Sequence, residues 1–292
     1  MRVSDAMLGE LNRAALAEGR AELAEAQRAS STGVRVAEPS DDPVLAARAR
    51  QSRSTERRAE AIRSIASRAV TTLSTVDGVL GQVTEALSRA RELAVQGGND
   101  TLAAGDRAAL AKEVRALRSQ LIDLANTRVD GEYVFGGLAV DRPPFDATGA
   151  FQGSTVRRQL APGPGVRLDV QLPGDAIFGV SGGVDTFAAL DALATALDAD
   201  DGPAVRGAVA GLEGAVEQVA DGRATLGVQQ EALLQAEAVA GRVRDDAIAK
   251  TAGLVEADPL STFTDLVKAE NALRQAIAVA GRLTPSLLGG GA

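Results

Sequence analysis

The chain has 292 residues, 45% of them apolar and only 2% aromatic, and its formal net charge is −8. This length is enough to bury a sizeable core or two modest domains. The chain has no His and no Cys, which excludes disulfides, thiol nucleophiles and the commonest zinc and haem ligands. The negative charge disfavours nucleic acid and anionic membranes as partners.

Membrane and catalytic classes are also disfavoured. No stretch approaches the roughly 18 consecutive apolar residues of a membrane span, and the first residues lack the pattern of a cleavable signal peptide. Composition alone therefore predicts a cytoplasmic protein, with export routes that use no such signal left open. A catalytic site would have to use carboxylates, Ser, Lys or the single Tyr133. We expect no catalytic residue, metal site or cofactor.

The first long helical region follows from proline, which clashes inside helices and is absent from residues 44–142. Apolar residues there recur in steps of four and three, the heptad spacing of coiled coils. Gly97, Gly98 and Asn99 are expected to end this helix, and Asp106 to cap a second one, which together form a helical hairpin. The apolar positions are Ile62, Ala66, Ala69, Leu73, Val76, Leu80, Val83, Leu87, Ala90 and Ala94, then Leu110, Val114, Leu117, Leu121 and Leu124.

The stretch 130–183 changes character, since it holds half of the prolines and many glycines. Within it, residues 166–172 alternate apolar and polar side chains between Pro-Gly pairs. Alternation with period two is typical of strands and hairpins. We therefore predict a small β-rich insert.

Helical spacing resumes near Asp185, first over Phe187, Leu190, Leu193 and Leu197, and then from Val205 through Val219. Its continuation to Ala240 is less regular, because Gln230 and Glu237 interrupt it. Asp258 and Pro259 predict the start of a last helix, as N-cap and first residue. Its apolar positions are Leu266, Ala269, Leu273, Ala276, Ala280, Leu283 and Leu287.

The N-terminal helix has a narrow apolar stripe, made of Val3, Met7, Leu11, Ala14 and Ala21. So narrow a stripe buries too little surface to stabilise an isolated helix in water. Both chain ends therefore need a partner. We expect an assembly seam that contains Met7, Leu11, Leu266, Leu273, Ala280 and Leu283.

The most specific motif is the stretch STGVRVAEPSDDPV at residues 31–44. Gly33 is expected to stop one helix, and Asp42 and Pro43 to begin the next, with acidic residues at its positive N-terminal dipole. An ordinary linker between two capped helices would have the same sequence features. A divalent cation bound by Asp41 and Asp42 is the disfavoured alternative, because no further oxygen ligands follow at loop spacing.

These residues resemble the N-terminal signature of the hook–filament junction family, the third hook-associated proteins, which are related to flagellin. Three further regions agree in order: residues 92–107, the run from Leu121 to Gly137 with Pro144 and Phe145, and the terminal heptad. The signature positions are Gly33, Arg35, Pro39, Ser40, Asp41, Asp42 and Pro43, then Asn126, Tyr133, Phe135, Gly136 and Gly137. The acidic stretch before the last helix is shorter than in the family, and the chain ends in Leu287-Leu-Gly-Gly-Gly-Ala.

The resemblance implies a mainly α fold, with a flagellin-like antiparallel helical bundle or coiled coil from both chain ends and a small central β-rich domain. The expected parts are an N-terminal assembly helix and linker (1–45), a helical hairpin (46–130), an outer insert (131–184), returning helices (185–258) and a C-terminal assembly helix (259–292). It also implies a structural adaptor, not an enzyme, between the hook-associated zone and the filament. Its partners would be copies of itself in a ring, the preceding hook-associated protein, flagellin, an export chaperone and the flagellar type III export apparatus. Its location would be the extracellular flagellum.

Other classes stay open at this point. Flagellin itself shares the terminal helices, and a soluble coiled-coil scaffold or signalling protein would show the same heptads. An enzyme that works with carboxylates would need one with a strongly shifted pKa in a pocket, and no residue pattern indicates one. The Arg-rich run from Arg48 to Arg68 is most simply a solvated helix face, with docking of an acidic neighbour as the alternative.

Overall fold

The computed structural model describes residues 5–36, 38–163, 166–179 and 182–288. The chain divides into two compact units, which we call the terminal unit (Met1–Arg58 with Val243–Ala292) and the central unit (Ala59–Arg242). The terminal unit thus combines both ends of the chain.

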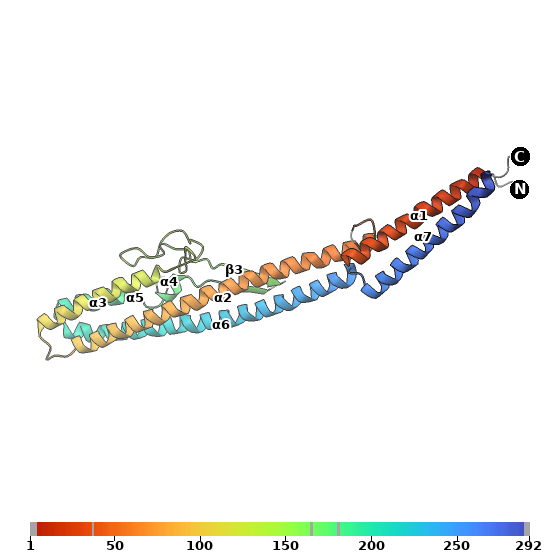
Figure 1. Cartoon of the computed structure of the whole chain (residues 1–292). Coiled ribbons are helices and arrows are strands. Elements are labelled where there is room, and N and C mark those ends of the chain that lie inside the picture. The colour runs from red at the N-terminus through yellow and green to blue at the C-terminus, as the bar shows by residue number, and fades with distance from the viewer. Residues whose placement is uncertain (1–4, 37, 164–165, 180–181, 289–292) are drawn as a thin grey trace. The chain divides into compact units, whose positions relative to one another are not determined.

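The secondary structure is dominated by helices (Figure 1). None of the described helices is both long and apolar enough to cross a membrane. In chain order the elements are α1 (Asp5–Thr32), α2 (Pro43–Gly97), α3 (Ala104–Ala125), β1 (Arg128–Val129), β2 (Glu132–Tyr133), β3 (Gln159–Gly163), β4 (Val166–Asp169), α4 (Gly174–Ile177), α5 (Thr186–Asp198), α6 (Gly202–Val255) and α7 (Pro259–Leu288).

In the central unit, α2 and α6 pair along the predicted heptads. All predicted α2 positions from Ala66 to Ala94 are buried. On α6 a buried residue recurs every seven positions, so the repeat is more regular than the sequence suggested. Each heptad has two core positions. Gln230 and Glu237 occupy the second of them, between the buried residues of successive repeats, and are half-buried. The buried α6 residues of this repeat are Val205, Leu212, Val219, Leu226 and Leu233.

Two further helices of the central unit, α3 and α5, pack against each other. Leu190, Leu193 and Leu197 of α5 are buried, and Asp185 caps that helix by accepting from the backbone N–H groups of Phe187 and Ala188. The prediction that Asp106 caps α3 is wrong. The helix begins two residues earlier, at Ala104, so Asp106 lies in its first turn, where a carboxylate is favourable to the helix dipole.

The insert between α3 and α5 has two antiparallel pairs, β1–β2 and β3–β4, and the alternating run at 166–172 contributes β4. Its core is aromatic. The ring of Phe178 stands edge-on to those of Phe135 and Phe145, at centroid distances of 5.7 and 5.1 Å, and stacks on Phe187 at 5.4 Å. Burial of aromatic rings, in addition to strand pairing, holds this loop-rich segment together.

Candidate assembly surface

In the terminal unit α1 and α7 pack side by side (Figure 1). The contact on α1 is made of small and aliphatic residues. Gly19 is buried, and a Cβ added there would lie 3.5 Å from Cδ1 of Leu273. Leu16 and Leu23, one turn to either side, are half-buried. Small residues let the two helix backbones approach closely at this point.

The predicted seam residues of α7 lie on the face toward α1. Ala269 is buried, and Leu266, Leu273, Ala276 and Ala280 are half-buried. The side chains of Leu283 and Leu287 lie outside the described residues. Asp258 caps α7, because its Oδ1 accepts from the Leu260 N–H at 3.0 Å.

The predicted stripe of α1 faces the other way. Met7 and Leu11 are 57% and 59% exposed, and Ala14 and Ala21 are exposed as well, while Val3 lies outside the described residues. An α-helix turns 100° per residue, so the stripe through Leu16, Gly19 and Leu23 occupies a different face. The structure therefore does not bring Met7 and Leu11 together with Leu273. Leu16 and Leu23 are spaced as a buried helix face requires, and the sequence could have indicated this. The apolar stripe through Met7 and Leu11 shows the same spacing and was chosen instead.

A second apolar surface covers the start of α7, on a face that α1 does not cover. Leu260, Phe263 and Val267, on successive turns, are 75%, 62% and 41% exposed. Farther along, Ile277 and Val279 are each 53% exposed. Exposed apolar side chains grouped in this way mark interaction surfaces.

The connection between α1 and α2 carries the first signature. Gly33 has a positive φ of 68°, which ends α1, and its carbonyl accepts from the Ala257 N–H at 2.9 Å. The Arg35 N–H donates to the Val255 carbonyl at 2.8 Å. The α1–α2 connection is thereby bonded to the α6–α7 connection through an antiparallel bridge between Val34 and Glu256.

The paired acidic residues of this connection bind backbone. Oδ1 of Asp42 accepts from the N–H groups of Val44 and Leu45, both at 2.9 Å, which makes Asp42 the N-cap of α2. Oδ2 of Asp41 accepts from the Glu38 N–H at 2.8 Å. No cluster of acidic residues suited to a metal ion occurs within the described residues. Arg35, Pro39, Ser40 and Pro43 are exposed.

A groove of about 400 Å³ lies beside this connection, between α1 and α7. Both signs of charge line it: Arg28, Arg35 and Lys268, and Glu22, Glu25, Asp41 and Asp265. Lys268 pairs with Asp265 at 3.2 Å. A mixed lining of this kind suits a protein surface better than a small apolar ligand.

The second signature supports the insert. The Asn126 side chain donates to the Phe145 carbonyl at 2.9 Å and accepts from its N–H at 3.0 Å. The guanidinium of Arg128 lies 4.2 Å above the Tyr133 ring, and Phe135 belongs to the aromatic core. A Cβ at Gly136 or Gly137 would lie 2.2 or 1.9 Å from the carbonyl oxygens of Ala139 and Ser154. These residues have packing roles.

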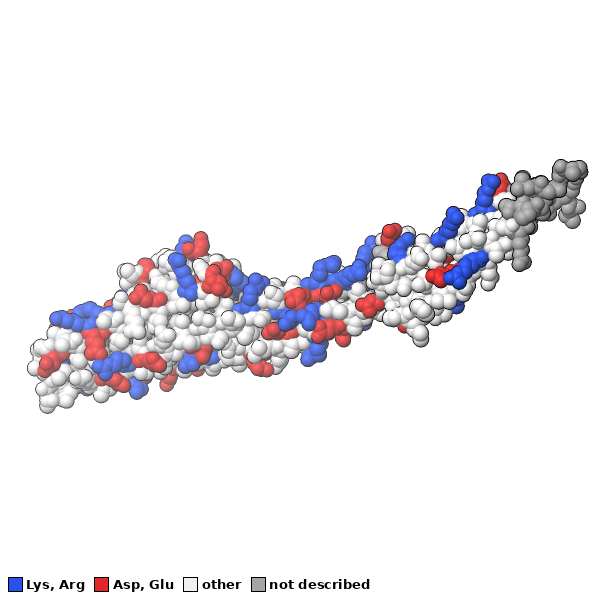
Figure 2. Space-filling model, in the orientation of Figure 1, with Lys and Arg blue, Asp and Glu red and all other residues white. Residues whose placement is uncertain are grey.

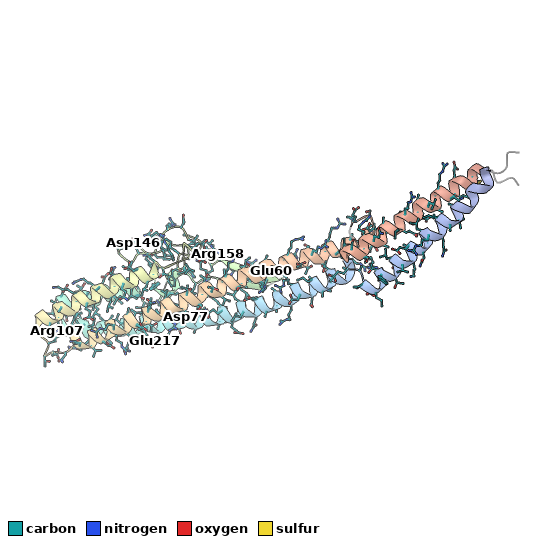
Figure 3. All side chains as sticks on the ribbon, in the orientation of Figure 1. Glu60, Asp77, Arg107, Asp146, Arg158 and Glu217 are labelled. Atoms are coloured by element: carbon teal, nitrogen blue, oxygen red, sulfur yellow. The ribbon has the colours of Figure 1, made fainter. Side chains whose placement is uncertain are left out.

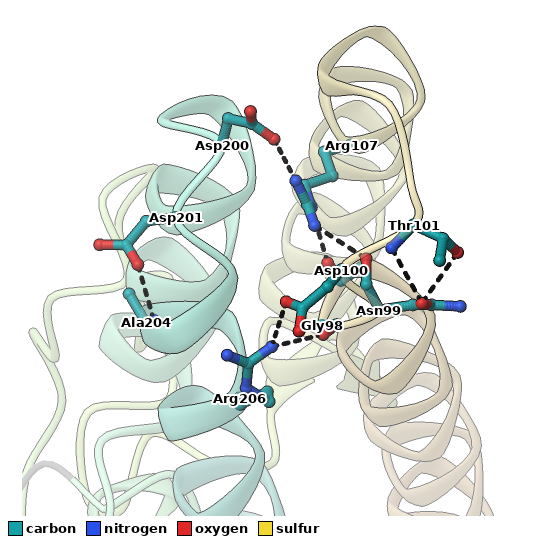
Figure 4. A network of polar contacts seen from close by, with 10 residues as sticks. Gly98, Asn99, Asp100, Thr101, Arg107, Asp200, Asp201, Ala204 and Arg206 are labelled. Carbon is teal, nitrogen blue, oxygen red and sulfur yellow. Dashed lines mark hydrogen bonds and ion pairs between the residues drawn. The ribbon is translucent and has the colours of Figure 1, made fainter.

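A polar clasp closes one end of the central unit, and no sequence pattern predicted it (Figures 3 and 4). Arg107 is 6% exposed; its Nε and Nη2 donate to the carbonyls of Gly97 and Asn99, both at 2.8 Å, and its Nη1 pairs with Asp200. Arg206 donates to Asp100 at 2.8 Å, which lowers the pKa of that carboxyl. The two arginines thus bind the α2–α3 and α5–α6 connections to each other.

These features define a helical protein whose ends pair with each other and expose apolar faces. The family profile of the bacterial flagellin N-terminal helical region matches residues 3–159. Flagellar hook-associated protein 3 of Escherichia coli K12 is 30% identical over 304 residues, covering 94% of both chains. Its counterpart in Salmonella typhimurium LT2 is 39% identical over 158 residues, a match that spans 52% of this chain and about half, 49%, of that protein.

Among solved structures, a putative flagellar hook-associated protein from Vibrio parahaemolyticus shares the fold, with a TM-score of 0.66 and 18% identity, over 74% of this chain and 100% of that one. The chain belongs to the flagellin-related family of flagellar hook-associated protein 3. Proteins of this family are structural parts of the bacterial flagellum and not enzymes.

Proposed function

We propose that this chain is the adaptor that joins the hook-associated zone of the flagellum to the flagellin filament. Its relatives are hook-associated proteins, and the exposed apolar faces of α1 and α7 carry the proposal for this chain. The partners are copies of itself in a ring, the preceding hook-associated protein and flagellin. Residues 1–45 and 259–292 are the assembly segments, and 131–184 faces outward.

The same faces lead us to propose that assembly completes the folding of the terminal helices. Leu11 and Phe263 each leave more than half of their surface in water. Their burial against neighbouring subunits would stabilise helices that gain little from propensity alone. Amide hydrogen exchange tests this step: α1 and α7 should exchange faster than α2 in the isolated chain and become protected in flagella. Equal protection of α1 in both states would contradict it.

We also propose how the chain reaches the flagellum outside the cell. The chain would be held by an export chaperone and pass through the flagellar type III apparatus, without a cleavable signal peptide, to the outside of the cell. A chain with no Cys forms no disulfide that would hinder such passage. Its detection in purified flagella with an intact N-terminus tests this route.

Deletion of the gene tests the adaptor role directly. We expect hooks without filaments, with flagellin released into the medium. Complementation with the wild-type chain should restore filaments, and Leu273→Asp, which places a charge against Gly19, should not. Long filaments formed by the purified chain alone would instead indicate flagellin, and normal assembly of Leu273→Asp would exclude this seam.

A further inference from the structure

The first part of α2 carries three arginines on one exposed face, Arg50, Arg53 and Arg57, which we call the arginine stripe. Their spacing of three and four residues places them on successive turns. Ala49 and Ser52, centred roughly 100° around the helix from the middle of this stripe, are buried. Figure 2 shows Lys and Arg side chains gathered over this part of α2. The stripe therefore points away from the packed interior of the terminal unit.

The stripe has no partner within the described part of the chain. None of its three guanidinium groups takes part in an ion pair or a side-chain hydrogen bond there, whereas Arg63, farther along α2, pairs with both Glu60 and Glu237. Like charges three and four residues apart on a helix repel each other and destabilise it. In a chain of net charge −8, the positive charge of this stripe is best neutralised by binding to an acidic surface.

The chain itself carries a matching surface on α1. Glu18, Glu22 and Glu25, which we call the acidic stripe, are exposed and likewise lack an ion pair among the described residues. They lie on the side of α1 that begins with Met7 and Leu11, and Glu22 and Glu25 also reach the rim of the groove beside α7, which Arg28, Arg35 and Lys268 line as well. The first and last residues of each stripe are seven positions apart, about 10.5 Å along a helix at 1.5 Å per residue. Two helices laid side by side therefore bring all three opposite charges within reach.

We propose that the arginine stripe of α2 docks the acidic stripe of α1 from a second copy of this chain. No described ion pair joins the two stripes within one chain, and a second copy offers the acidic stripe with the matching charge and spacing. Arginine favours such contacts because its guanidinium binds a carboxylate with two hydrogen bonds. The inference rests on the proposed self-assembly and adds the charged contact that fixes how neighbouring copies are placed. Nucleic acid is the less favoured occupant, because the whole chain repels a polyanion.

Crosslinking between copies tests the contact, since the chain has no cysteine of its own. Two full-length variants, Glu22→Cys and Arg53→Cys, are produced together, and isolated flagella are treated with a short bis-maleimide. We expect a covalent dimer that contains one chain of each kind. The matched control replaces Arg53→Cys by Arg58→Cys, an exposed position on a different face of α2, and should give little dimer.

Charge reversal gives a second, independent readout. The triple variant Arg50→Glu, Arg53→Glu, Arg57→Glu should lose most filaments while keeping the helicity of the purified chain. Adding Glu18→Arg, Glu22→Arg and Glu25→Arg to the same chain should restore them. Failure of this swap would show that the acidic partner is not this chain and would overturn the proposal.

The remaining outcomes separate this inference from the proposed function. Wild-type chain that never appears in flagella would defeat the proposed function. Chains that reach flagella without forming the mixed dimer, or a triple variant that assembles normally, would defeat the inference alone. Binding of the wild-type chain to a duplex DNA at physiological salt, abolished in the triple variant, would assign the stripe to nucleic acid and overturn it as well.

Discussion

Arg223 of α6 donates two hydrogen bonds to Asp77 of α2, from Nε to Oδ1 at 2.8 Å and from Nη2 to Oδ2 at 3.2 Å. The contact lowers the pKa of Asp77 and raises that of Arg223, chiefly through hydrogen bonding. A second ion pair, between Arg63 and Glu237, lies two heptads away on each helix. Both pairs join α2 to α6 in antiparallel order, because the higher-numbered residue of α2 pairs with the lower-numbered residue of α6.

Removal of the Asp77–Arg223 pair should have a small, pH-dependent effect. Both side chains are about 40% exposed, so solvent screening holds the coupling free energy to about 0–1 kcal/mol. Because the pKa of Asp77 is lowered by folding, its contribution is present above its ordinary pKa of 3.8 and is lost as the pH falls through the folded value.

A double-mutant cycle with Asp77→Asn and Arg223→Gln, by urea unfolding at neutral pH and again in acid, measures this coupling free energy. The pair formed by Arg91 and Glu213, at 3.9 Å, is the matched control and should couple less. A coupling that grows in acid would contradict the assignment.

Arg107→Ala should destabilise the central unit more than the loss of any exposed ion pair. It removes the guanidinium donors to the Gly97 and Asn99 carbonyls and the ion pair with Asp200, although the Asn99 carbonyl still accepts from the Leu102 N–H at 3.1 Å. We expect a loss of about 2–3 kcal/mol in the free energy of unfolding. Arg115→Ala, which breaks only an exposed pair with Asp198, should cost less than about 1 kcal/mol. Equal losses for both variants would mean that the clasp does not stabilise the unit.

The clasp shows where sequence reasoning stops. Heptad spacing predicted the buried residues of α2 and α6, because a helix repeats its environment every seven residues. The burial of Arg107 depends on two connections that meet in space, with Asp200 more than ninety residues away in the chain. No local sequence pattern predicts that the α2–α3 and α5–α6 connections contact each other. In the insert, likewise, prolines and glycines indicated loops, but the packing of Phe135, Phe145 and Phe178 arises only in three dimensions.

Gly137→Ala should strongly destabilise the insert. Gly137 has a φ of 61°, and an added Cβ would lie 1.9 Å from the carbonyl oxygen of Ser154, so the backbone must move. We expect a loss above about 2 kcal/mol, measured by urea unfolding. Gly78→Ala is the matched control, since nothing lies within 4 Å of the added Cβ on α2, and it should stabilise by about 0.5–1 kcal/mol. A harmless Gly137→Ala would indicate that this turn adapts.

The two faces of α1 could not be ranked from the sequence, because both carry apolar residues at helical spacing. The stripe that begins at Met7 is the more visible, with a Leu and a Met at its start. Leu16 and Leu23 flank Gly19, and the absence of a side chain at Gly19 lowers the apparent apolarity of the face that packs on α7. The close approach that glycine permits is a property of the pair of helices.

This difference between faces yields a paired prediction. Leu23→Asp places a charge on the half-buried face toward α7 and should weaken the α1–α7 pairing in the isolated chain by about 2 kcal/mol or more. Leu11→Asp changes an exposed residue and should leave the isolated chain within about 0.5 kcal/mol of wild type.

In cells both variants should fail to form filaments, Leu23→Asp because its terminal unit is damaged and Leu11→Asp because the outward face no longer fits a neighbouring subunit. Circular dichroism of the purified chains and electron microscopy of the cells separate the two causes. Glu10→Gln, next to Leu11 in the sequence, controls for a general sensitivity of α1 and should assemble normally. Filaments of normal number with Leu11→Asp would show that this face stays in water after assembly and would remove Met7 and Leu11 from the seam.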